Sequence, residues 1–85
     1  MPAALAEILR KAPMSHEKMA FAWRSAVGPT MDRGTSIALE GSVLRVRTDN
    51  VAWRREVERS GLLIRTRLDA LLGKGVIRAI EIAGD

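Results

Sequence analysis

The stretch over residues 41–72 constrains the fold most, because its pattern changes from the period of a strand to that of a helix within a few residues. Residues 43–48 alternate by residue type, with Leu44, Val46 and Thr48 on one parity. Such alternation is typical of a half-buried strand. The predicted strand therefore turns one face toward a core, and its other face carries two arginines.

A long helix is predicted to follow this strand, over residues 51–72. Asp49 and Asn50 interrupt the strand and offer side-chain oxygens to the free backbone N–H groups of a helix start. Apolar or small residues then recur at spacings of three and four, which places them on one stripe. They are Trp53, Val57, Gly61, Ile64, Leu68 and Leu71. We expect this stripe to lie against a sheet or another helix.

Two helices are predicted before the first strand. The first spans Ala3–Lys11 and ends before Pro13, and the second has Ser15 as its N-cap and ends at Gly28. Pro29 stops its continuation. Residues 30–35 are predicted to form a polar connection, in which one helical turn is an option.

The remaining elements are strands. Ser36–Glu40 is predicted as the first strand, and Gly41–Ser42 as a two-residue type II′ turn that makes it an antiparallel neighbour of the second. A turn over residues 73–75 leads to a third strand at Val76–Ala83. The pattern leaves open whether this strand lies beside the first or the second.

The element order is therefore helix, helix, strand, strand, helix, strand. A small sheet covered on one face by helices is the economical arrangement for such an order. We predict an α+β fold with a three-stranded sheet. Because 85 residues leave no room for a second core, residues 1–85 are expected to form a single domain.

The net charge of +4 is concentrated in the second strand and the long helix. Residues 45–74 contain eight basic and four acidic residues, whereas the rest of the chain has six of each. A local basic excess is typical of nucleic-acid binding, although a solvated arginine-rich face has the same pattern. The candidate nucleic-acid-binding residues are Arg45, Arg47, Arg54, Arg55 and Arg59. We expect the strand arginines on the sheet face away from the helices, combined with those of the helix start.

No arrangement typical of catalysis or metal binding is evident. His16 is the only histidine, there is no cysteine, and the common phosphate-loop, serine-hydrolase and zinc-protease motifs do not occur. We therefore predict a protein that is not an enzyme, with no cofactor and no metal. Trp23 and Trp53 each occupy the centre of an apolar stripe and are predicted to lie in the core. Nucleic-acid binding would then depend on contacts between arginine and phosphate, with little sequence specificity.

The expected location is the cytoplasm. Residues 1–9 lack the basic region and long apolar run of a signal peptide. No apolar segment approaches the roughly 18 to 20 residues that cross a bilayer. We expect a soluble protein with no membrane partner.

Several short motifs along the chain point to a known family. They are a helix with Trp23 that ends in Val27 and Gly28, a hairpin with Gly41, Leu44 and Val46, Trp53 opening a long helix, the helix end Leu68–Gly73 and the closing strand Val76–Ile82. With these features the chain resembles the DciA family of bacterial replicative helicase loaders over nearly its whole length. The resemblance implies a K-homology-like (KH-like) domain, with helices on one face of a three-stranded sheet. The G-x-x-G loop with which KH domains clamp nucleic acid is missing here.

The resemblance implies a function as well as a fold. The main hypothesis is a non-enzymatic adaptor in bacterial DNA replication, which binds the replicative DNA helicase and contacts single-stranded DNA through the five candidate arginines. The alternative is a small RNA-binding KH-like protein that uses the same basic face. A third class is a protein-interaction module whose basic surface meets an acidic partner. The oligomeric state stays open.

Overall fold

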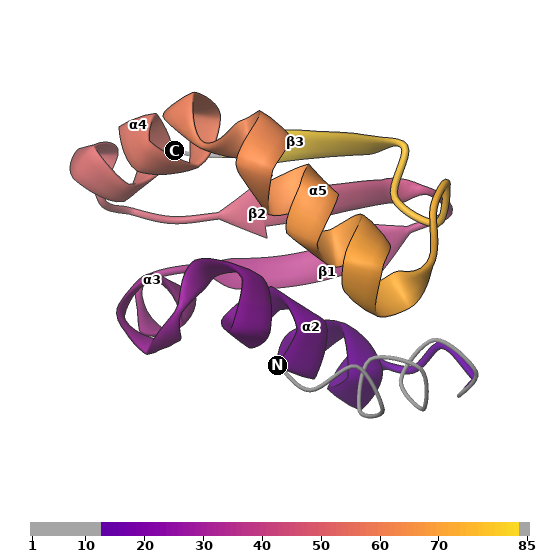
Figure 1. The fold of residues 1–85 in the computed structure, drawn as a ribbon. Helices are drawn as coiled ribbons and strands as arrows, with labels where there is room; N and C mark the ends of the chain where they lie inside the picture. Colours follow the sequence, from indigo (N-terminus) through magenta and orange to yellow (C-terminus); the bar gives the residue numbers. More distant parts are fainter. Residues whose placement is uncertain (1–12, 84–85) are drawn as a thin grey trace.

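The computed structural model describes residues 13–83, which form helices and a sheet in two layers (Figure 1). The elements in chain order are α2 (His16–Val27), α3 (Pro29–Arg33), β1 (Ser36–Glu40), β2 (Val43–Arg47), α4 (Val51–Arg59), α5 (Gly61–Leu72) and β3 (Ala79–Ala83). Helices α2 and α5 lie side by side on one face of the sheet, and α4 packs near β3. This arrangement confirms the predicted α+β class. The helix expected at Ala3–Lys11 lies outside the described residues.

The sheet has β2 at its centre. Strand β1 is antiparallel to β2, and β3 is parallel to β2 on the other side. The third strand thus lies beside the second, which the sequence pattern had left open. Parallel neighbours need a crossover connection, and α4 with α5 supplies it by returning the chain to the end at which β2 begins.

The hairpin between β1 and β2 has the predicted geometry. Glu40 pairs with Val43, so Gly41 and Ser42 form a two-residue turn. Gly41 has a φ of +61°, and no non-glycine residue in the described part of the chain has a positive φ. A positive φ at the first turn position followed by a negative one is the combination of a type II′ turn.

The core lies between the sheet and the helices. Leu44 and Val46 of β2 are fully buried, as is Val57 of α4, and Trp23 of α2 is 1% exposed. The predicted stripes of the helices therefore face inward, and α2 begins at the predicted cap, where the Ser15 hydroxyl accepts from the backbone N–H of Lys18. The other buried apolar residues are Met19, Ala22, Ala26, Met31, Ile64, Leu68, Leu71, Leu72 and Ile77.

The prediction of one continuous helix over residues 51–72 is wrong, because the helix is broken at Ser60. The backbone of Ser60 has φ −95° and ψ 7°, which ends α4, and α5 starts at Gly61. Kinks in helices commonly occur at Ser and Gly pairs. The Ser60 hydroxyl also donates to Glu56 Oε1 at 3.2 Å. The apolar stripe continues through this break, and it is the reason that the pattern alone indicates a single helix.

The helical turn that was an option after Gly28 is present as α3, while one further boundary differs from the prediction. Pro29 begins α3 at its first position, where the backbone N–H that proline lacks would have no partner within the helix. Strand β3 starts at Ala79, three residues later than predicted. The residues before it still contribute to the fold, because Ile77 is fully buried and the Arg78 N–H donates to the Ser42 carbonyl at 2.8 Å.

Candidate nucleic-acid interface

The sheet face away from the helices presents two of the candidate arginines. Its residues form three rows across the strands, Ser36–Arg47–Ala83, Ala38–Arg45–Glu81 and Glu40–Val43–Ala79. Four of the nine positions hold serine or alanine, so the long arginine side chains stand above small neighbours. Arg45 and Arg47 are exposed while Leu44 and Val46 are buried, as the alternation predicted.

Arg45 lies between two carboxylates from the neighbouring strands. Its Nε is 3.2 Å from Glu40 Oε2, and its terminal nitrogen is 3.8 Å from Glu81 Oε1. Glu81 is directly opposite Arg45 in the register, and Glu40 is one row away. The two carboxylates offset the charge of Arg45, so the centre of this face is a poorer site for a polyanion than the sequence alone suggests.

Arg47 is in a different environment at the end of β2. A hollow of about 260 Å³ is lined by Arg47 together with Arg33 from the end of α3. Among residues 13–83, no ion pair involves either arginine. The remaining lining residues are Gly34, Thr35, Ser36, Thr48 and Asp49. Two arginines from elements distant in sequence thus line one hollow, together with three residues that carry hydroxyl groups and the acidic residue Asp49.

Hydrogen bonds hold the segments that carry these two arginines. The Thr48 hydroxyl donates to the Gly34 carbonyl at 2.8 Å, which ties the end of β2 to the segment after Arg33. The Thr35 hydroxyl donates to the Met31 carbonyl at 2.8 Å and accepts from the indole Nε1 of Trp23 at 3.0 Å. Arg33 and Arg47 therefore project from a backbone that is anchored to the core.

The three candidate arginines of α4 are placed differently from those of β2. Arg54 lines a hollow whose other wall includes Ile80 and Ile82, on the helix side of the sheet. Arg55 is exposed, and Arg59 lies 3.6 Å from Glu56. The five arginines thus do not form one platform, because those of β2 face away from the helices and Arg54 lies on the opposite side of the sheet.

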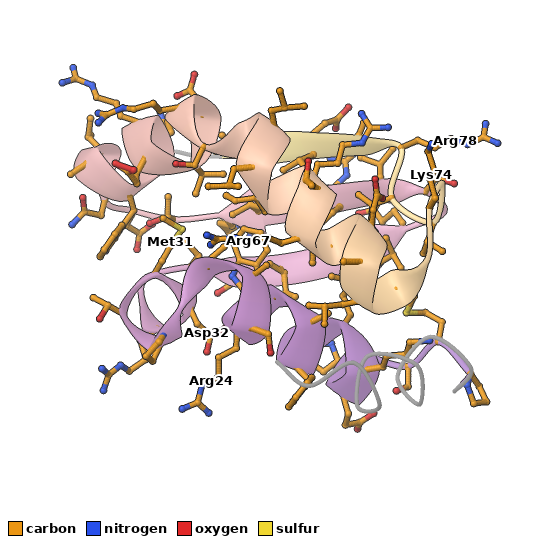
Figure 2. The ribbon with its side chains drawn as sticks, viewed as in Figure 1. Arg24, Met31, Asp32, Arg67, Lys74 and Arg78 are labelled. Carbon is orange, nitrogen blue, oxygen red and sulfur yellow. The ribbon has the colours of Figure 1, made fainter. Side chains whose placement is uncertain are left out.

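Arg67 has a structural contact that sequence reasoning missed. Its terminal nitrogen donates to the carbonyl of Ala26 at 2.8 Å, across 41 residues of sequence (Figure 2). Ala26 is in the last turn of α2, where carbonyl groups lack partners within the helix and cations are favoured. Arg67 therefore links α5 to the end of α2. Arg33 was missed as well, because it lies outside the basic stretch over residues 45–74.

A second pair of basic residues lies at the other end of the sheet. Lys74 and Arg78 are exposed in the segment before β3, next to the β1–β2 turn (Figure 2). Gly73 has a φ of +108°, and its N–H donates to the Asp69 carbonyl at 2.9 Å. This is the geometry of a helix end, which favours a structural interpretation of the Gly73–Lys74–Gly75 sequence over a phosphate-binding one.

Other kinds of site find no support in the described residues. Within residues 13–83, no three His, Cys, Asp or Glu side chains gather in a way that would hold a metal ion. His16 is exposed at the start of α2. None of the helices described for this part of the chain combines the length and apolarity needed to cross a membrane.

Comparison with known sequences identifies the family. No match is found among curated proteins. The model of one protein family, described as "Dna[CI] antecedent, DciA", matches residues 2–82, which is nearly the whole chain. The match covers every element described above except the last residue of β3. The protein therefore belongs to the DciA family.

Proposed function

We propose that this protein is a non-enzymatic adaptor of bacterial DNA replication, which binds the replicative DNA helicase and contacts single-stranded DNA. Its membership of the DciA family carries the proposal, since the match extends over residues 2–82. Members of this family are loaders of the replicative helicase. A loader needs surfaces for protein and for DNA, and it needs no catalytic group of its own.

Single-stranded DNA would be held mainly through its phosphates. Among the described residues, Phe21 is the one exposed aromatic ring available for stacking, since Trp23 is buried and Trp53 is half-buried. Exposed arginines instead supply charge that attracts phosphate and is screened by salt. The contacts are therefore expected to be insensitive to base sequence.

The candidate arginines are expected to contribute unequally. Arg47 and Arg55 are exposed and take part in none of the ion pairs of residues 13–83, so their charge is available to phosphate. Arg33 adds to Arg47 because both line one hollow. Arg45 and Arg59 contribute less, since carboxylates already lie beside them. Arg54 is expected to contribute least, because it lines the hollow on the helix side of the sheet, away from Arg47.

Charge reversal tests the DNA surface. The variant Arg47→Glu/Arg55→Glu should bind labelled single-stranded DNA more weakly than the unaltered protein, measured by fluorescence anisotropy at several salt concentrations. If each arginine neutralises one phosphate, the slope of log K against log salt should become shallower by about 1.4. Competition with RNA of the same length separates the DNA hypothesis from the RNA-binding alternative.

The matched control reverses the same number of charges elsewhere. Lys74→Glu/Arg78→Glu changes the net charge equally at the opposite end of the sheet. An equal loss of affinity in both variants would mean that total charge, rather than the proposed surface, governs binding. Adding purified replicative helicase to the same titrations tests the adaptor role, because a ternary complex should raise the anisotropy further.

A further inference from the structure

The break between α4 and α5 opens a hollow of about 580 Å³ beside β3. This is more than twice the volume of the hollow that Arg33 and Arg47 line. Its walls are residues of α4, the first residue of α5 and two isoleucines of β3. They are Arg54, Val57, Glu58, Gly61, Ile80 and Ile82.

Gly61 keeps this hollow open. A Cβ atom built at Gly61 would meet nothing within 4 Å, and Gly61 is in helical backbone that any residue can adopt. Neither close packing nor backbone strain therefore requires a glycine at this position. Leu62 and Leu63 follow directly and are 82% and 52% exposed. Two adjacent exposed leucines add apolar surface next to the break, which is a feature of protein-contact sites.

Strand β3 contributes an edge as well as a wall. Among the described residues it pairs with β2 alone, so alternate N–H and C=O groups of β3 point away from the sheet. Ile80 and Ile82 alternate with Glu81, and both isoleucines are half-buried on the helix side. An extended segment that pairs with this edge would direct every second side chain toward the hollow.

The lining of the hollow favours a protein segment over nucleic acid. It contains no aromatic ring on which a base could stack, and its charged members are one arginine and one glutamate. A polyanion needs a more uniformly positive wall. Along α4 the signs are ordered, with Arg54 and Arg55 near the start and Glu58 one turn later, while Glu56 lies beside Arg59. A carboxylate on a bound segment would complement Arg54, which lines the hollow.

We propose that the hollow and the adjoining edge of β3 form a groove that binds an extended segment of the replicative helicase, with one side chain of the segment in the hollow and a carboxylate near Arg54. The segment pairs with the free edge of β3. This inference rests on the proposed function, and it separates the helicase surface from Arg47, which faces away from the helices. One small chain can then hold helicase and DNA at the same time.

Filling the groove tests the inference. Gly61→Leu adds a side chain at a residue that lines the hollow, where the Cβ atom meets nothing within 4 Å. Ala52→Leu is the control because it adds bulk at an exposed position of α4 away from the lining residues. Affinity for purified replicative helicase, measured by biolayer interferometry, should fall by about tenfold or more in Gly61→Leu. It should change less than about twofold in Ala52→Leu, and thermal unfolding should show that both variants are folded.

Two further readouts assign the occupant. Single-stranded DNA should bind Gly61→Leu as it binds the unaltered protein, and amides of β3 should exchange more slowly when helicase is bound. Loss of DNA affinity instead of helicase affinity would overturn the inference and make the groove a nucleic-acid site. Unslowed exchange in β3 would overturn the strand pairing.

The same titrations separate this inference from the proposed function. Helicase binding that is equal in the unaltered protein and in Gly61→Leu overturns the groove alone. An unaltered protein that does not bind helicase overturns the proposed function and the groove together. Gly61→Ala provides a graded control, since a single methyl group should weaken helicase binding less than leucine does.

Discussion

The two ends of α4 differ in how closely their neighbours fit. At the start of the helix, a Cβ atom added at Gly34 would be 2.5 Å from the indole Nε1 of Trp53. At its end, a Cβ atom added at Gly61 would meet nothing within 4 Å. Both glycines adjoin the same helix, yet one is required by close packing and the other leaves a hollow. A glycine in the sequence does not reveal which of these applies.

The closely packed end also provides hydrogen-bond partners for backbone N–H groups of the helix start. Asn50 Oδ1 accepts from the backbone N–H groups of Ala52 and Trp53, at 2.8 Å and 3.1 Å, as expected of an N-cap. The Thr48 hydroxyl accepts from the Asn50 N–H at 3.2 Å and donates to Gly34. These bonds determine where β2 ends and where α4 begins, so this end of the helix is expected to tolerate little change.

Removal of the Trp53 ring should give the largest loss of stability. Trp53 is half-buried against the core and packs on Gly34, so Trp53→Ala should destabilise the fold by about 3 kcal/mol. Urea unfolding followed by circular dichroism measures the change. A variant of unaltered stability that no longer binds DNA or helicase would instead place the ring in a binding site.

Gly34→Ala should have a smaller effect with the same origin. The added methyl group overlaps the Trp53 indole, and the ring or the backbone must move, at a cost of about 1 to 3 kcal/mol. Urea unfolding of Gly34→Ala, Trp53→Leu and the double variant measures the coupling between the two positions. If the ring is the cause, the penalty of Gly34→Ala should shrink in the Trp53→Leu background. An unchanged penalty would contradict the close contact.

Gly61→Ala should have the smallest effect, and of opposite sign. Alanine is favoured over glycine in a helix, and its methyl group meets no neighbour, so unfolding should become less favourable by about 0.5 to 1 kcal/mol. The same urea titration reports it. Destabilisation in Gly61→Ala would show that the two ends of α4 are packed alike, and it would remove the contrast between them.

Much of the fold could be predicted from local patterns. The strand over Ser36–Glu40, the turn at Gly41–Ser42 and the caps at Ser15 and Asn50 all have the predicted bounds, because each depends on residues within a few positions. The break at Ser60 was missed because the apolar stripe continues through it. The pairing of β3 with β2 was left open, because no local sequence pattern indicates which of two earlier strands a later strand pairs with.

The candidate site was harder to predict than the fold. The exposure of Arg45 follows from alternation, but its two carboxylate partners come from strands that only the sheet register brings together. Arg33 and Arg47 line one hollow for a similar reason, although they are 14 positions apart in the sequence. Charge counted along the chain therefore overstates the charge that the centre of the sheet face offers to a partner.

The sequence by itself determined the elements with short-range causes, namely the strand alternation, the helix caps, the type II′ turn and the core stripe. It also indicated the DciA family through motifs spread along nearly the whole chain, which the family match over residues 2–82 confirms. Only the tertiary structure determined which arginines carry an offset charge, where α4 ends and that a hollow adjoins β3. The physical reason is range, because caps and alternation act over a few residues, whereas ion pairs and hollows depend on segments that meet only in the folded chain.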